Sequence, residues 1–171
     1  MNLYILRHAI AAHPGDPGMP AGLDDFDRPL TAEGRRKLQR SIAGMKALGV
    51  RPGLVVTSPL VRAVRTAEMF AKAVGIPRSA LVVSGHLAPG GSREELIHEI
   101  NRLAQQAPDI LLVGHEPDLG KLIGLLCAGT PSASFELKKG GLAKLEVAKL
   151  RRGRCATLDW LLTSKQMRLT G

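Results

Sequence analysis

The sequence is poor in aromatic residues, which make up 3% of its 171 residues, and it contains only two cysteines. Cys127 and Cys155 do not form a Cys-x-x-Cys pair, a usage that fits a reducing cytosol and predicts a structural role for each thiol. With so few rings, the core must be built from Leu, Val, Ile and Ala, and surfaces on which nucleic-acid bases could stack are scarce.

Long apolar runs are also missing. The first run, residues 3–6, is cut by Arg7 and His8 and has no basic region before it, so it fits neither a signal peptide nor a membrane span. No other stretch is long enough to cross a bilayer. We therefore expect a cytoplasmic protein with no membrane partner.

Acidic residues are outnumbered, with 24 Lys and Arg against 15 Asp and Glu and a formal net charge of +9. Such a charge raises the possibility of a nucleic-acid or other anionic partner. Many of the cations fall on the outer faces of predicted helices, however, where solvated side chains are common. Together with the scarcity of aromatic rings, this argues against nucleic acid as the partner.

Apolar runs and helical periodicities alternate along the chain. They predict strands at 3–6, 54–57, 80–84, 109–114, 142–147 and 155–161, and helices at 31–48, 59–74, 93–107 and 117–127. The Pro- and Gly-rich residues 10–30 are expected to form a long loop. This order predicts one α/β domain, residues 1–171, as a three-layer sandwich with a central mostly parallel sheet and helices on both faces.

Polar side chains follow three of the predicted strands. Arg7 and His8 follow the first, Ser58 follows the second with Arg62 just beyond, and His115 ends the strand at 109–114. In parallel sheets the carboxyl ends of the strands share one edge, where ligands bind. Two arginines, two histidines and adjacent helix N-termini would suit a dianionic phosphoryl group.

The spacing of these motifs resembles the histidine phosphatase superfamily, which has the phosphoglycerate mutase-like fold, and within it the SixA-type phosphohistidine phosphatases. Four motifs in order carry the resemblance: Leu6-Arg7-His8-Ala9; Arg28-Pro29-Leu30-Thr31 with Gly34; Ser58-Pro59-Leu60 with Arg62 and Thr66; and Val113-Gly114-His115-Glu116-Pro117.

The resemblance implies that His8 is the nucleophile and forms a phosphohistidine intermediate that water hydrolyses. Arg7, Arg62 and His115 correspond to the groups that hold the phosphoryl oxygens. This is covalent catalysis supported by fixed cations. His8 must then be neutral at the attacking nitrogen, with its other ring N–H donating to a backbone carbonyl.

Three further residues are candidates for the site. Ser58 at its strand end and His86 in the loop at 85–92 are candidate substrate contacts, and Glu116 is the candidate proton donor. The spacing of Glu116 does not settle that last role, and the resemblance to SixA-type members implies a site without a dedicated acid. We expect no cofactor. A metal site built from His8, His115 and Asp118 is conceivable, but the two arginines beside it would repel the cation.

Ala9 replaces the glycine usual in the superfamily, and the Ser and Asn of the mutase-like members are absent, which argues against a phosphoglycerate mutase. The short chain leaves little to cover the site, so a phosphohistidine on a protein surface is the expected substrate. Two alternatives remain open at this stage. One is a phosphatase for small phosphomonoesters, and the other is a non-catalytic module that binds phosphate or nucleic acid.

Overall fold

A computed structural model describes residues 1–171 and contains one sheet of six strands in the order β3-β2-β4-β1-β5-β6. The strands are β1 (Asn2–Arg7), β2 (Leu54–Thr57), β3 (Leu81–Val83), β4 (Asp109–Gly114), β5 (Leu142–Val147) and β6 (Ala156–Leu162). β1 to β4 are mutually parallel, whereas β5 is antiparallel to both of its neighbours, β1 and β6. The predicted mostly parallel central sheet is confirmed.

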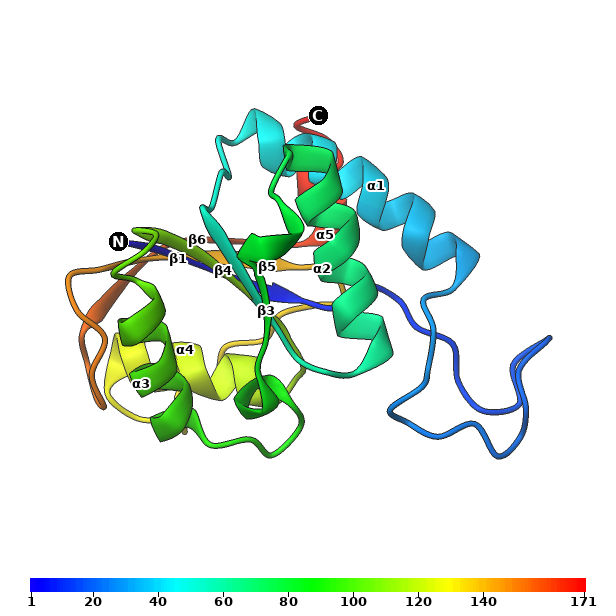
Figure 1. Ribbon diagram of the computed structural model, residues 1–171, viewed down its shortest axis with the longest axis horizontal. Helices are drawn as coiled ribbons and strands as arrows, with labels where there is room; N and C mark the ends of the chain where they lie inside the picture. Colours follow the sequence, from blue (N-terminus) through cyan, green and yellow to red (C-terminus); the bar gives the residue numbers. More distant parts are fainter.

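Helices cover both faces of this sheet, as predicted (Figure 1). They are α1 (Ala32–Ala47), α2 (Val61–Val74), α3 (Arg93–Leu103), α4 (Asp118–Ala128) and α5 (Ser164–Met167), with short 3-10 helices η1 (Arg78–Ala80) and η2 (Gly85–Leu87). α1, α2 and α5 lie on one face, and α3 and α4 lie on the other (Figure 1). None of the helices combines the length and apolar character that crossing a lipid bilayer requires.

Successive side chains of β1 point to opposite faces of the sheet, so this strand contributes to the hydrophobic core on both faces. Leu3 and Ile5 pack toward α3 and α4, while Tyr4 and Leu6 pack toward α1 and α2. Both sides of β1 and β4 are therefore buried, which explains why these strands are continuous apolar runs. The strands end as soon as the sequence turns polar, at the edge where the site forms.

Two helix ends differ from the sequence prediction by two or more residues, and one helix was not predicted. α2 begins at Val61, not at Pro59, because the backbone of Leu60 is extended (φ −65°, ψ 136°) and Leu60 therefore takes the N-cap position. α3 ends at Leu103 instead of 107, in keeping with Pro108, which disfavours helical backbone in the residue before it. α5 was not predicted, because its single turn is too short to show a helical period.

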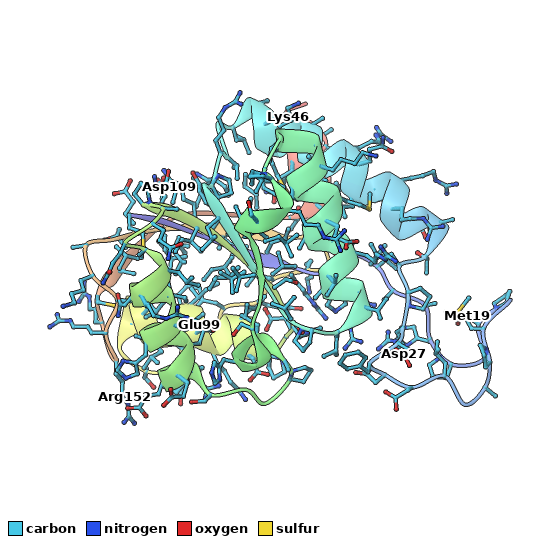
Figure 2. All side chains as sticks on the ribbon, viewed as in Figure 1. Met19, Asp27, Lys46, Glu99, Asp109 and Arg152 are labelled. Atoms are coloured by element: carbon cyan, nitrogen blue, oxygen red, sulfur yellow. The ribbon has the colours of Figure 1, made fainter.

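Residues 10–30 form the expected long loop, which projects from the body of the protein beside the carboxyl end of β1 (Figure 1). An antiparallel bridge between Ala11 and Leu30 ties its two ends together. Met19 and Asp27 lie on this loop, whereas Asp109, at the start of β4, lies across the protein from them (Figure 2). The loop therefore stands at the edge of the sheet to which the sequence assigns the site.

Candidate active site

The carboxyl ends of β1, β2 and β4 bring the predicted residues together. Arg7 of β1 is level with Gly114 of β4, and the His8 amide donates to the Gly114 carbonyl over 3.1 Å. The His8 and His115 rings are consequently neighbours, with centroids 5.1 Å apart. Both histidines are buried, at 6% and 3% exposure.

The ring of His8 is fixed by the backbone beside it. Its Nδ1 lies 2.7 Å from the Ala9 carbonyl oxygen, which can only accept, so Nδ1 carries the proton and Nε2 keeps its lone pair. The Ala9 amide in turn donates to the Thr66 hydroxyl over 3.1 Å. Burial, reinforced by nearby cations, lowers the pKa of His8 to about 3, so the imidazole is neutral at ordinary pH.

His115 is held by Ser58, whose Oγ lies 2.7 Å from Nε2. Because the Leu60 amide already donates to this Oγ, the hydroxyl is well placed to donate its own proton to Nε2. Nδ1 of His115 then carries the hydrogen, and it is buried with no partner in the protein. Burial lowers the pKa of His115 to about 4. Ser58 thus contacts a site histidine, and its contact with substrate stays a prediction.

Both arginines are anchored through one part of the guanidinium group. Arg7 donates from Nη1 to the Leu137 carbonyl over 2.9 Å. Arg62, only 4% exposed, donates from Nη1 to the Asp25 carbonyl over 2.5 Å and from Nη2 to Asp25 Oδ2 over 2.9 Å. The Nε atoms of both arginines are buried without a partner.

Across the whole structure, three buried side-chain nitrogen or oxygen atoms lack a hydrogen-bond partner, and all three belong to this cluster. They are Nε of Arg7, Nε of Arg62 and Nδ1 of His115. A buried donor without a partner is costly, and it is tolerated where a ligand supplies the acceptor. Three N–H donors in one cluster with His8 match the oxygens of a phosphoryl group.

Asp25 is a member of the site that the sequence did not predict. It lies on the loop 10–30, and its carboxylate accepts from both Arg62 and Arg28. The hydrogen bond from Arg28, supported by Arg62, holds the pKa of the Asp25 carboxyl below its usual value. Its position within the acidic stretch 24–27, directly before Arg28, was the only available signal.

Glu116 supports the other arginine. Its Oε1 accepts from the Leu137 amide over 3.0 Å, and the carbonyl of the same Leu137 accepts from Arg7. Burial raises the pKa of the Glu116 carboxyl. Its role as proton donor stays a prediction, whereas its contact with the backbone that holds Arg7 is direct.

His86 lies on η2 and is partly exposed, and its ring forms no hydrogen bond with Arg7, His8, Arg62 or His115. Its contact with substrate therefore also stays a prediction. No group of three or more His, Cys, Asp or Glu side chains is arranged to hold a metal ion.

The two lowered histidine pKa values predict a pH-dependent stability. Below the ordinary histidine pKa of 6.5, the unfolded chain binds protons that the folded site does not bind, so stability falls as the pH falls. Each histidine contributes a loss of up to about 1.4 kcal/mol per pH unit until the pH reaches its folded pKa. Urea unfolding measured between pH 7.5 and pH 4.5 tests this slope.

Replacing His8 with glutamine should reduce that slope, because one of the two groups is removed. His98 is an exposed histidine on α3, so His98→Gln is the matched control and should leave the slope unchanged. An equal slope in wild type and His8→Gln would contradict the burial of a neutral His8.

Comparisons with known proteins agree with this geometry. The sequence profile of the histidine phosphatase superfamily (branch 1) matches residues 3–81. An uncharacterized protein from Picosynechococcus sp. is 37% identical over 153 residues, which cover 88% of each chain. The phosphohistidine phosphatase SixA from Escherichia coli is 29% identical over 136 residues, covering 79% of this chain and 80% of that protein.

Among solved structures, that of the protein histidine phosphatase SixA complexed with tungstate is similar in fold. It superposes with a TM-score of 0.80, covering 98% of this chain and 99% of the other at 23% identity. The profile match includes Arg7 at the end of β1, His8 directly after it, and the helix α2, which carries Arg62. On these grounds, the chain belongs to the histidine phosphatase superfamily.

Proposed function

We propose that the protein is a phosphohistidine phosphatase that removes the phosphoryl group from a histidine of a cytoplasmic protein through a covalent intermediate on His8. The observation that carries this proposal is the neutral Nε2 of His8 beside three buried, unpartnered N–H donors. Covalent phosphoryl transfer requires a nucleophile with a free lone pair and a preorganised set of hydrogen-bond donors for the phosphoryl oxygens.

In the first step, the Nε2 lone pair of His8 forms a bond to phosphorus as the bond between phosphorus and the substrate imidazole breaks. The substrate ring enters with a proton already on its other nitrogen, so the electron pair of the broken bond stays on the leaving nitrogen and the ring departs as neutral imidazole. The Nδ1–H of His8 stays on the Ala9 carbonyl, which stabilises the positive charge that develops on the ring. Arg7, Arg62 and His115 donate to the phosphoryl oxygens throughout.

In the second step, a water oxygen attacks the phosphorus of phosphorylated His8. The bond between phosphorus and Nε2 breaks, inorganic phosphate leaves, and the lone pair returns to a neutral His8. The low pKa of His8 supports this step, because the ring is a weak base and therefore a good leaving group. No atom of the enzyme is consumed in the cycle.

The similarity to SixA supports phosphohistidine as the substrate. The bond between phosphorus and an imidazole nitrogen places little demand on an acid, because the leaving nitrogen is itself readily protonated. Hydrolysis of phosphohistidine therefore does not require Glu116 to act as a proton donor. The same site would be less well suited to alkyl phosphates, whose leaving oxygen needs a proton donor.

Relative rates on two classes of substrate test the proposal. A histidine-containing peptide phosphorylated with phosphoramidate should be hydrolysed with a kcat/KM at least about tenfold above that for any sugar phosphate. Rapid quenching at alkaline pH, followed by mass spectrometry, should find one phosphoryl group on the peptide that contains His8. Faster turnover of a sugar phosphate would identify a small-molecule phosphatase instead, and no turnover of either class would contradict the proposal.

A further inference from the structure

A basic groove opens beside the proposed active site, between α1, the residues before β5 and α5. Its volume is about 560 Å³, within the usual range of ligand sites. No acidic residue lines it, whereas six cationic residues do: Arg7, Lys37, Lys138, Lys139, Lys165 and Arg168. Because Arg7 is shared with the proposed phosphoryl site, the groove begins where the chemistry is expected.

Most of this charge is not neutralised within the protein. Lys37 and Lys138 pair with glutamates outside the lining, each at 2.5 Å. Lys139 and Lys165 form no ion pair, and both are exposed. Arg168 donates to the Ser164 hydroxyl, which is neutral. The groove therefore attracts anions.

The walls of the groove are anchored to the site. The Gly140 amide, next to Lys139, donates to the carbonyls of Arg7 and His8 over 3.2 and 3.1 Å. α5, which carries Lys165, is joined to α1 by a hydrogen bond between the Ser164 and Ser41 hydroxyls at 2.9 Å. The cations are thus presented by backbone that is fixed relative to His8, which lowers the ordering cost of binding.

The lining favours a peptide over a nucleic acid. It contains no aromatic ring on which a base could stack, and it includes the apolar residues Ala9, Ile10 and Leu38. Carboxylates alternating with small side chains would match a groove that is lined by both cations and apolar side chains. A surface of this kind beside His8 fits residues that flank a phosphorylated histidine.

We propose that the basic groove binds a short acidic segment of the phosphohistidine protein, adjacent in that protein to the phosphorylated residue. This inference rests on the proposed phosphohistidine phosphatase function and adds a basis for partner selection. The groove attracts and orients the acidic segment, and the phosphohistidine then enters the site at Arg7.

A matched pair of phosphorylated peptides tests the inference. In one peptide the histidine is flanked by glutamates, and in the other the same positions carry glutamines. Wild-type protein should show a kcat/KM about tenfold or more higher for the acidic peptide. The preference should shrink toward one when the salt concentration is raised to about 0.5 M, because exposed charges are then screened.

The double variant Lys139→Gln/Lys165→Gln should lose most of the preference at low salt. Arg36→Gln/Lys72→Gln removes the same charge from an exposed surface between α1 and α2, and it should keep the preference. Equal rates for the two peptides in wild type would overturn the groove inference while the phosphatase function stands. Failure to hydrolyse either peptide would refute the proposed function and the inference with it.

Binding of a single-stranded RNA oligonucleotide is measured in parallel. RNA binding that depends on Lys139 and Lys165, without a preference between the two peptides, would assign the groove to nucleic acid and overturn the inference. Absence of RNA binding, together with the peptide preference, supports it.

Discussion

Replacing His8 with alanine should lower kcat for phosphate release by about 10⁴-fold or more, the scale seen when a covalent nucleophile is removed. No other side chain in the cluster can take over the attack. The Nε2 of His115 is engaged with Ser58, and its Nδ1 is assigned a proton for the phosphoryl oxygens. The variant should also fail to acquire a phosphoryl group in the quenched-flow experiment.

His98→Ala is the control for this substitution, because it removes an exposed imidazole from α3 and should leave kcat unchanged. The fold of His8→Ala is checked by urea unfolding at pH 7.5. A folded His8→Ala protein that retains wild-type turnover would refute the nucleophile assignment, and a phosphoryl group found on His115 would move the assignment to that residue.

The architecture was predictable because β1 and β4 are buried on both faces. Only continuous apolar runs satisfy that environment, so the strands could be located within a residue or two, and each ends where Arg7 or His115 begins the site. α5 had no such signal. Its position against α1 depends on tertiary contacts such as the Ser41–Ser164 hydrogen bond, which leave no period in the sequence.

In the site, too, residues on or next to regular elements could be located from the sequence, whereas residues on irregular segments could not. His8, Arg62 and His115 could be brought together from the sequence because parallel strands and a following helix determine where they lie. Asp25 could not, because it is placed by a long irregular loop and contacts Arg62 across 37 positions of the chain. The role of Leu137 was also hidden, since it acts through its backbone amide and carbonyl and any residue type offers the same groups.

The contact between Asp25 and Arg62 leads to the second large effect. Arg62→Gln should lower kcat/KM by about 10³-fold, the upper range for loss of one donor to a charged transition state. Asp25 occupies Nη1 and one hydrogen of Nη2, which leaves Nε–H and the second Nη2 hydrogen as a fork for two phosphoryl oxygens. Glutamine has neither the charge nor this fork.

Two further variants separate this effect from a general loss of charge. Arg65→Gln removes an exposed arginine from the same helix and should leave kcat/KM unchanged. Asp25→Asn keeps the backbone carbonyl that accepts from Arg62 but weakens the hold on Nη2, so a loss of about tenfold is expected from imperfect alignment. A gain in kcat/KM in Asp25→Asn would instead show that the carboxylate competes with the phosphoryl group for Arg62, and wild-type kinetics in Arg62→Gln would remove that residue from the site.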